Sequence, residues 1–555
     1  MKAREGEKPT SGKLARALTG MALATSLFPL VLQSTSAVAD DDKVRHVLLV
    51  SVDGFHAVDL EICIANNTCP NLKQLSEHGV TYTNASTTKP SDSFPGLLAQ
   101  LTGGTSKSTG VFYDDSYDRT LFAPTGSPAA PCASGPGAEV NLAENTDKNL
   151  HSIDGGVPAS LTGLNSAVAI DPNNLPGQTV SGICTPLWPH NFVRTNTVFG
   201  VLHKHRYQTA WSDKHPAYDI INGNDPDTQP VNEPGTNVDD FFAPEINSDL
   251  SAANISLIHS LGLKSTAPNP TPVPGADFTG TIDGIEWYDG IKVQAILNEI
   301  KGFDHTGKIR LGTPRLFGMN FQAVSVGQKL KCCGYKDPAA TPSDGLANAI
   351  AFVDKSIGQM IDALNDRGLA ERSVVIISAK HGQSAIDVTK RKTFSDSAVI
   401  ATPIGANFSF DIGDDGVLIW LKSNSGTKNA DAVAALNAFG ATGIGEWLSG
   451  PLLPLSYKDP AKDSRTPDII GIANIGTIYT GGSKLAEHGG FNEDDTHVAL
   501  LVSHPDLKER SINTAVATTQ IAPTILRVLG LNPQELEAVR LEDTQVLPGL
   551  FVDRD

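Results

Sequence analysis

Val47-Leu48-Leu49-Val50-Ser51-Val52-Asp53-Gly54 is the stretch that decides the fold class of this chain. Its first six residues are almost all apolar, and the run ends at an acidic residue and a glycine. Such a run is typical of a strand that is buried on both faces, as in a parallel sheet covered by helices. Side chains that bind ligands gather just beyond the carboxyl ends of such strands. Asp53 is therefore the first candidate functional residue.

Strand and helix patterns alternate along the rest of the chain. The clearest helical pattern covers residues 346–366, where apolar side chains recur every three or four positions. Further strands are predicted at residues 207–212, 316–326, 373–378 and 498–503. Further helices are predicted at residues 71–78, 195–205, 288–301 and 521–530. This alternation predicts an α/β fold with a mostly parallel central sheet and helices on both of its faces.

Three stretches interrupt this alternation, at about residues 115–190, 222–280 and 395–480. The first two are rich in turn-forming Gly, Pro, Asn and Asp residues and show little periodicity. The third mixes such residues with short strand and helix patterns. Since no internal repeat divides the chain, we expect one domain over residues 40–555 with three loop-rich insertions.

The first 39 residues have the three parts of a secretory signal peptide. They carry five basic and two acidic residues, an apolar run over residues 18–32, and the ending Ala37-Val38-Ala39. We expect cleavage after Ala39, a secreted or periplasmic protein, and no membrane span in the remaining chain. Removal of this segment changes the formal net charge from −18 to −21. A protein this acidic is not expected to bind duplex nucleic acid through its phosphates.

All six cysteines lie after residue 39, and an even number in an exported chain predicts disulfides. Six cysteines allow fifteen pairings. Cys63 with Cys69 would close a small loop, and Cys132 with Cys184 would cross-link the first insertion. The adjacent pair Cys332-Cys333 is awkward to join, because a bridge between neighbours needs a strained peptide. None of the spacings is that of a zinc knuckle, so we interpret the cysteines as structural.

A second stretch, Lys89-Pro90-Ser91-Asp92-Ser93-Phe94-Pro95-Gly96, joins an extended run to an apolar helical pattern. A serine at such a corner can cap the helix, because its side chain accepts hydrogen bonds from backbone N–H groups. The same corner favours an anion, through those N–H groups and the helix dipole. We expect Ser93 both to cap its helix and to act as a nucleophile.

Polar residues follow several of the predicted strands or lie at the ends of loops. They are Asp53, Lys214, His215, Lys380, His381 and His488. Because the carboxyl ends of parallel strands meet at one edge of a sheet, we expect these side chains to lie near Ser93. A carboxylate, a hydroxyl and imidazoles are ligands of divalent cations. A cation beside Ser93 would stabilise its alkoxide and make it a competent nucleophile.

Five motifs occur here in the order in which they occur in the alkaline phosphatase superfamily. They are Ser51-Val52-Asp53-Gly54-Phe55, Thr88-Lys89 with Ser93-Phe94-Pro95, Lys380-His381-Gly382, His488-Gly489, and Ile521-Ala522-Pro523-Thr524. The chain resembles most closely the type I phosphodiesterase/nucleotide pyrophosphatase branch of that superfamily. The resemblance implies two zinc ions around the nucleophile. By resemblance, Asp53, Ser93 and His381 are donors to the first ion, and His488 is a donor to the second.

The sequence departs from the family pattern at three of the six metal-binding positions other than the nucleophile. Lys380 stands where the family has Asp, and Val324 and Gln328 stand where it has Asp and His. We predict that Lys380 acts in catalysis by placing its ammonium group against a phosphoryl oxygen, because its charge can replace part of a metal's. Lys214 and His215 resemble the Lys and His with which sulfatases hold a sulfate ester. They are therefore predicted to hold the phosphoryl or sulfuryl group.

The resemblance implies an exported, metal-dependent hydrolase of phosphoric esters, with zinc as the metal. Its expected substrates are small phosphodiesters or nucleotides with a pyrophosphate bond, cleaved through a phospho-serine on Ser93. The first alternative is a sulfatase or phosphonate hydrolase of the same superfamily, although the sulfatase pattern Cys/Ser-x-Pro-x-Arg is absent around Ser93. The second alternative is an inactive, exported binding protein, which the three lost metal donors favour.

Overall fold

The computed structural model describes residues 44–124, 132, 135–142, 146–395, 399–440 and 442–550. The predicted signal peptide, residues 1–39, lies outside these residues.

Eight strands form the central sheet, in the order β19-β2-β18-β11-β1-β10-β8-β9. Their bounds are β1 (His46–Val52), β2 (Gly79–Tyr82), β8 (Ala210–Ser212), β9 (Asp240–Phe242), β10 (Leu316–Phe321), β11 (Ser373–Ser378), β18 (Leu501–Ser503) and β19 (Arg510–Ile512). β1 runs parallel to both of its neighbours, β10 and β11, and β8 and β9 continue the parallel array. β18 is antiparallel to β11 and to β2. The sheet is mostly parallel, which confirms the predicted α/β class.

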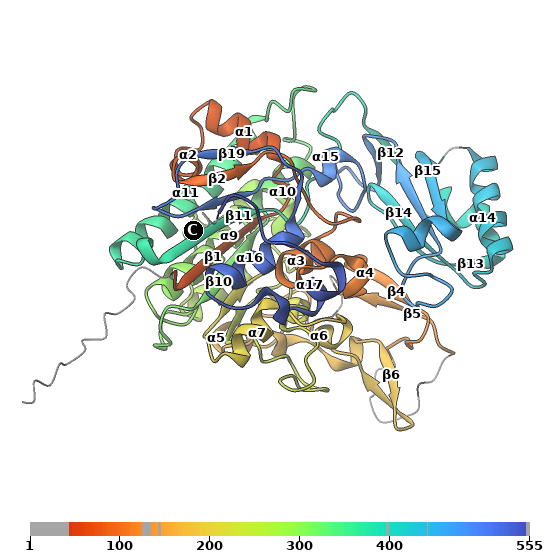
Figure 1. Ribbon diagram of the computed structural model, residues 1–555, viewed down its shortest axis with the longest axis horizontal. Coiled ribbons are helices and arrows are strands. Elements are labelled where there is room, and N and C mark those ends of the chain that lie inside the picture. The colour runs from red at the N-terminus through yellow and green to blue at the C-terminus, as the bar shows by residue number, and fades with distance from the viewer. Residues whose placement is uncertain are drawn as a thin grey trace, which may run out of the picture. The chain divides into compact units, whose positions relative to one another are not determined.

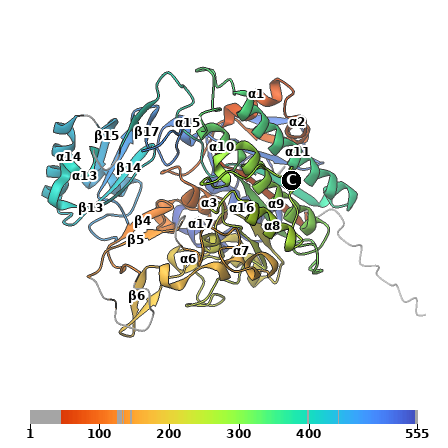
Figure 2. The ribbon, with the colours of Figure 1, turned by 180° about the vertical axis from the view of Figure 1, so that it is seen from behind.

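Helices cover both faces of this sheet (Figures 1 and 2). The main ones are α3 (Ser93–Thr102), α7 (Val198–Lys204), α9 (Ile282–Ile300), α11 (Asp344–Asp366) and α16 (Ile521–Val528). Successive side chains of a strand point to opposite faces. Leu48 and Val50 accordingly belong to a buried cluster with α9 and α11, whereas Val47 and Leu49 belong to a second cluster with α3, α7 and α16. β1 is therefore buried on both faces, as its apolar run predicts.

The strand predicted over residues 316–326 is too long. β10 ends at Phe321, and a helix, α10 (Ala323–Lys329), begins two residues later. The buried Asp289 carboxylate on α9 accepts hydrogen bonds from the backbone N–H groups of Gln322 and Ala323, both at 2.8 Å. Because these N–H groups are taken by a side chain, the apolar residues that follow continue as a helix and not as a strand.

The third insertion forms a second sheet, which is antiparallel and has the order β13-β14-β16-β15. Its strands are β13 (Phe408–Ile412), β14 (Gly416–Leu421), β15 (Ile444–Ser449) and β16 (Ile469–Ala473). A helix, α14 (Gly426–Phe439), shares a buried cluster with one face of this sheet (Figure 1). The other face packs against Phe112 and Tyr113.

The first insertion contains two hairpins, β4 (Asp115–Asp118) with β5 (Ala138–Asn141) and β6 (Gly177–Val180) with β7 (Ile183–Pro186).

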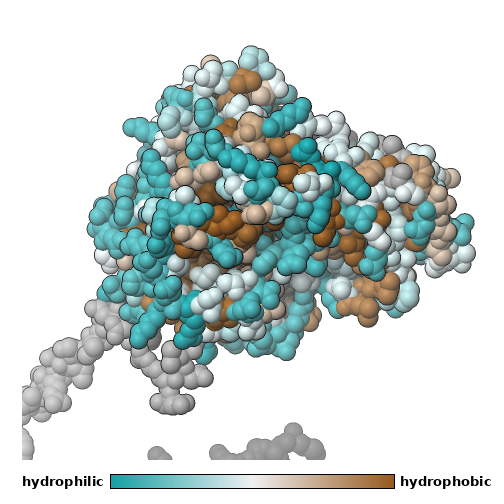
Figure 3. Space-filling view, turned by 90° about the horizontal axis from the view of Figure 1, so that it is seen from above, coloured by the Kyte–Doolittle hydropathy of each residue, from teal (hydrophilic) through white to brown (hydrophobic). Residues whose placement is uncertain are grey.

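Among the described residues, no helix is long and apolar enough to cross a membrane. On the face shown in Figure 3, hydrophilic side chains predominate and apolar ones lie in patches between them. The sequence contains 61 acidic and 43 basic residues.

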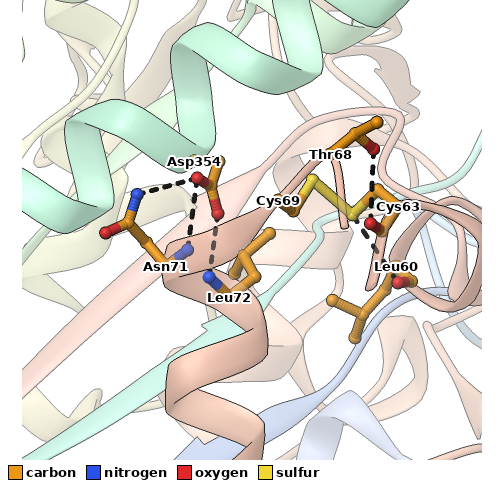
Figure 4. Close-up of a disulfide and its surroundings, with 7 residues drawn as sticks. All are labelled: Leu60, Cys63, Thr68, Cys69, Asn71, Leu72 and Asp354. Atoms are coloured by element: carbon orange, nitrogen blue, oxygen red, sulfur yellow. Dashed lines mark hydrogen bonds between the residues drawn. A yellow bond between two sulfur atoms is a disulfide. The ribbon is translucent and has the colours of Figure 1, made fainter. Parts of the chain in front are cut away.

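Three disulfides join Cys63 to Cys69, Cys132 to Cys184, and Cys332 to Cys333. The first closes the loop between α1 (Ala57–Ala65) and α2 (Pro70–Glu77), as Figure 4 shows. The second cross-links the first insertion through β7. The predicted structural use of the cysteines is confirmed, including the vicinal pair.

Figure 4 also shows how α2 is attached to α11. The buried Asp354 carboxylate accepts hydrogen bonds from the backbone N–H groups of Asn71 and Leu72, at 3.3 and 2.8 Å. It accepts another from the Asn71 side chain at 2.8 Å. These backbone groups lie in the first turn of α2, where an N–H group has no partner within its own helix. Asp354 thus caps α2 from a distant helix.

We predict that Asp354→Ala lowers the free energy of unfolding by about 2 kcal/mol, because it leaves buried N–H groups without a partner. Chemical denaturation followed by circular dichroism measures this change. The control is Asp362→Ala, which removes an exposed carboxylate from the same helix. The control should change the free energy of unfolding by less than about 0.5 kcal/mol. Equal effects of the two substitutions would contradict the capping role.

Candidate active site

Four neighbouring strands of the central sheet, β11, β1, β10 and β8, end at the same edge. Predicted site residues follow three of these four strands. Asp53 follows β1, Lys380 and His381 lie beyond β11, and Lys214 and His215 lie beyond β8. The fourth strand is β10, between β1 and β8, and the polar residues at its end are Asn320 and Gln322. Parallel strand direction therefore brings side chains from distant parts of the chain to one place.

Ser93 meets this edge at the first turn of α3. Its Oγ lies 2.9 Å from Lys214 Nζ and 3.1 Å from His381 Nε2. It lies 3.4 Å from Asp53 Oδ2. The ring of His488 stacks on that of His381, with centroids 3.8 Å apart. The structure thus brings five of the predicted site residues into direct contact.

Ser93 does not cap its helix, so that part of the prediction is wrong. The N-cap is Asp92, whose Oδ1 accepts a hydrogen bond from the backbone N–H of Phe94 at 3.2 Å. Ser93 is the first helical residue, which leaves its hydroxyl to face Lys214 and His381. Gly96 allows this approach, because a Cβ there would lie 2.1 Å from the carbonyl oxygen of Lys380.

The Asp53 carboxylate is fully buried and has a protein donor on each oxygen. Asn320 Nδ2 donates to Oδ1 at 2.7 Å, and Gln322 Nε2 donates to Oδ2 at 2.6 Å. Burial alone would raise the pKa of Asp53, but nearby cationic side chains, Lys380 first among them, hold it well below its ordinary value. Sequence analysis missed Asn320 and Gln322, although their position at the end of a buried strand was a usable signal.

Lys380 lies behind the site. Its Nζ is 2.8 and 3.0 Å from the two oxygens of Asp213, and neither side chain is exposed to solvent. The ammonium group also lies over the Tyr218 ring, 4.0 Å from its centroid. Burial lowers the pKa of Lys380, and Asp213 opposes that shift. Lys380, predicted to place its ammonium group against a phosphoryl oxygen, is thus paired with Asp213, and the ammonium group in contact with Ser93 is that of Lys214.

The three histidines of the site are all buried. His381 Nδ1 lies 2.7 Å from the carbonyl oxygen of Gly382. His215 Nδ1 lies 2.9 Å from Glu245 Oε1. Burial lowers the pKa of His381 and places that of His488 well below its ordinary value. Burial and the charge of Lys214 lower the pKa of His215 to about 3. Burial therefore disfavours the charged form of all three imidazoles.

These donors do not fit the two-zinc cluster that the resemblance implies. At the second metal's positions, Val324 has no donor atom, and Gln328 Nε2 donates to the Gly54 carbonyl at 2.8 Å. His488 is the one donor of that set that remains. Over the described part of the chain, no group of three or more His, Cys, Asp and Glu side chains is arranged to hold a metal ion.

The first metal's set is closer to complete, but it is already occupied by a protein cation. The donor atoms of Asp53, Ser93 and His381 lie 3.1 to 3.4 Å apart, a spacing that one tetrahedral ion tolerates. Lys214 Nζ lies 2.9 Å from the serine oxygen and 3.5 Å from the Asp53 carboxylate. An ion bound there would displace that ammonium group or require it to lose its proton.

A cavity of about 400 Å³ opens at Lys214, the lysine that contacts Ser93. Lys214, His215, Gln322 and His488 are among the residues that line it. Its other charged lining residues are Asp114, Asp115, Lys329, Asp414, Lys484 and Glu487. The described lining contains no Phe, Tyr or Trp side chain. The cavity is thus strongly polar and suits a small charged molecule.

Comparison with known proteins places this arrangement in a family. The family model for type I phosphodiesterase / nucleotide pyrophosphatase matches residues 47–131 and 192–499. No curated protein matches the sequence.

Solved structures with the same fold cover most of the chain. Murine ectonucleotide pyrophosphatase/phosphodiesterase 5 is similar with a TM-score of 0.53 and 14% identity, over 88% of this chain and 96% of that one. An inactive variant of that murine protein, in complex with AMP, has a TM-score of 0.53 and 13% identity over the same shares. The alkaline phosphatase PafA has a TM-score of 0.55 and 14% identity, again over 88% and 96%. At these identities the likeness establishes the fold.

We predict that Lys380→Met lowers the free energy of unfolding by about 3 kcal/mol, because it leaves the Asp213 carboxylate buried without its cation. The double variant Lys380→Met/Asp213→Asn should recover a large part of this loss, since it removes the unpaired charge. Chemical denaturation of the two single variants and the double variant measures the coupling. Additive losses in the double variant would show that the two side chains do not interact.

Proposed function

The chain belongs to the type I phosphodiesterase / nucleotide pyrophosphatase family, and we propose that it hydrolyses phosphoric esters through a phospho-serine on Ser93. Membership makes it a phosphoric diester hydrolase-like enzyme. The proposed substrates are small phosphodiesters and nucleotides with a pyrophosphate bond. The observation that carries the proposal is the Ser93 hydroxyl at a helix N-terminus, in contact with an ammonium group and an imidazole.

In the proposed reaction, Ser93 Oγ attacks phosphorus, and the bond from phosphorus to the leaving oxygen breaks. The Lys214 ammonium group and the N–H groups at the start of α3 stabilise the negative charge of the phosphoryl oxygens. His215 lines the same cavity and is proposed to contact the phosphoryl group. Water then hydrolyses the phospho-serine and releases the enzyme.

Metal use belongs to the family pattern, and zinc is the metal that the sequence predicts for Asp53, Ser93, His381 and His488. These residues lie together, but Lys214 and the amide groups of Asn320 and Gln322 occupy the positions around Asp53. The steps above are therefore those that the chain's own groups carry out.

A sulfatase or phosphonate hydrolase is the second candidate. The contact of Lys214 with Ser93, and the presence of His215 in the same cavity, favour it. The absence of the sulfatase nucleophile pattern around Ser93 weighs against it. The third alternative, an inactive binding protein, has to explain why Ser93, His381 and Lys214 still contact one another.

The three disulfides support export to an oxidising compartment. We therefore keep the proposal of a secreted or periplasmic protein, with a small phosphate ester or a nucleotide as its partner. The AMP complex of the murine protein shows a nucleotide bound to this fold in that protein. Here the described lining of the cavity holds no Phe, Tyr or Trp, so the imidazole rings of His215 and His488 are the aromatic surfaces that it offers to a base.

We expect Ser93→Ala to lower the turnover of an aryl phosphodiester by about 1,000-fold or more, because it removes the nucleophile. Release of nitrophenolate from bis(4-nitrophenyl) phosphate measures the rate. The matched control is Ser260→Ala, which removes an exposed hydroxyl that is not part of the site and should keep the parental rate. Unchanged turnover by the Ser93 variant would refute the proposed nucleophile.

The substrate class is tested by comparing aryl esters that share one leaving group. We expect the phosphodiester to be cleaved about tenfold faster than the phosphomonoester and the sulfate. The reason is that a phosphomonoester carries two negative charges and needs more fixed positive charge than the ammonium group of Lys214 provides beside Ser93. Faster cleavage of the sulfate would instead support the second candidate.

A further inference from the structure

The positive charge in contact with Ser93 belongs to a lysine of the chain. We propose that this site activates Ser93 without a metal ion: His381 Nε2 takes the hydroxyl proton, and the Lys214 ammonium group stabilises the phosphoryl oxygens. This inference rests on the proposed hydrolysis through Ser93 and deepens it. It gives His381 a different role from the metal donor that the resemblance implies.

His381 presents its lone pair to Ser93. Its Nδ1 lies 2.7 Å from the Gly382 carbonyl oxygen, which can only accept a hydrogen bond. Nδ1 therefore carries the proton of the neutral ring, and Nε2 is the acceptor. Nε2 lies 3.1 Å from Ser93 Oγ, within the range at which a general base receives a proton. This is the relation between a serine nucleophile and its base in metal-free hydrolases.

Asp53 has no need of a metal to balance its charge. Each of its oxygens accepts a hydrogen bond from a side-chain amide, of Asn320 or of Gln322. The Lys214 ammonium group lies 3.5 Å from Oδ2. A divalent ion bound to the same oxygen would lie against this ammonium group, and the two positive charges would repel each other.

Lys214 is fixed in place by the buried pair behind it. Asp213 Oδ1 accepts a hydrogen bond from the backbone N–H of Lys214 at 2.9 Å. The same carboxylate binds the Lys380 ammonium group through both oxygens. Lys380 is thus a positioning residue, which acts on Ser93 through Asp213 and Lys214.

The place of the second metal is filled by a network of hydrogen-bonded side chains. Gln328 Nε2 donates to the Gly54 carbonyl oxygen at 2.8 Å and to the Tyr335 hydroxyl at 2.9 Å. Tyr335 donates in turn to Asp59 at 2.9 Å, and His56 Nδ1 lies 2.9 Å from the same carboxylate. Gln328 Nε2, Tyr335, Asp59 and His56 are thus joined by hydrogen bonds, and the bond to the Gly54 carbonyl stabilises the loop that carries Asp53.

The proposed reaction balances without a metal. In the first step the bond from Ser93 Oγ to phosphorus forms and the bond to the leaving oxygen breaks. The serine proton moves to His381 Nε2, and the leaving oxygen takes a proton from water, which leaves a hydroxide ion. In the second step water attacks phosphorus, the bond to Oγ breaks, and His381 returns its proton to Oγ. The proton lost by the attacking water neutralises the hydroxide ion.

The first test removes metals from the full chain. The protein is dialysed against a strong zinc chelator, its metal content is measured by plasma mass spectrometry, and its phosphodiester turnover is compared with that of untreated protein. We expect less than about 0.1 metal ion per chain and a rate within about twofold of the untreated one. A loss of turnover on chelation that zinc restores would overturn the proposal.

The second test does not depend on turnover. A fluorophosphonate reagent phosphonylates an activated serine: the bond to phosphorus forms, fluoride leaves, and the serine proton goes to the base. We expect intact-mass analysis to find one adduct, on Ser93, in chelated protein. His381→Ala should slow labelling by about 100-fold or more. Lys214→Met should slow it by about tenfold or more, and Lys214→Arg should slow it less because the charge is kept.

Matched controls remove the same side chains elsewhere. His151 and Lys336 have side chains that are 80% and 51% exposed, so His151→Ala and Lys336→Met should label at the parental rate. If chelation abolishes both labelling and turnover, and zinc restores turnover, this inference is overturned and the proposed function stays intact. Absence of both labelling and turnover in every preparation would overturn the proposed function itself.

Discussion

The buried carboxylate of Asp53 is the constraint on which the site depends. A charge at the end of a strand with no solvent exposure is costly unless protein groups or ions compensate it. Here two side-chain amides from the end of β10 and the ammonium group of Lys214 provide that compensation. Because the carboxylate is satisfied, Lys214 Nζ, Ser93 Oγ and Asp53 Oδ2 can all lie within 3.5 Å of one another. The position of the cation next to the nucleophile follows from the need to neutralise Asp53.

Lys380 affects the site without contacting Ser93. At Lys380 the family has an aspartate, and a cation there would repel a metal bound to Asp53. The Lys380 ammonium group instead pairs with Asp213, and both side chains are fully buried. Asp213 in turn accepts the backbone N–H of Lys214. The positive charge of Lys380 is therefore balanced by Asp213, and the same aspartate holds the backbone of Lys214 in place.

The family match and the shared fold establish the sheet and the helices that carry the site. They say less about which groups carry out the reaction. The same sheet edge carries the serine, the aspartate and both histidines that the family pattern requires. The residues that differ are those that would complete a pair of metal ions, and they have become part of internal networks such as that of Gln328 and Tyr335.

The sequence by itself determined the α/β class, the buried strand at its centre, the long helix over residues 346–366, the structural role of the cysteines, and the candidate set Asp53, Ser93, His381 and His488. Local patterns carry this information, because burial on two faces and helical periodicity leave clear marks in the order of residues. Tertiary structure alone decided that Asp289 ends β10 and that Asn320 and Gln322 bind Asp53. It also decided which lysine contacts the serine. Such contacts join residues that are distant in the chain, and two lysines that look alike in the sequence differ in charge partner, burial and direction only once the strands have paired.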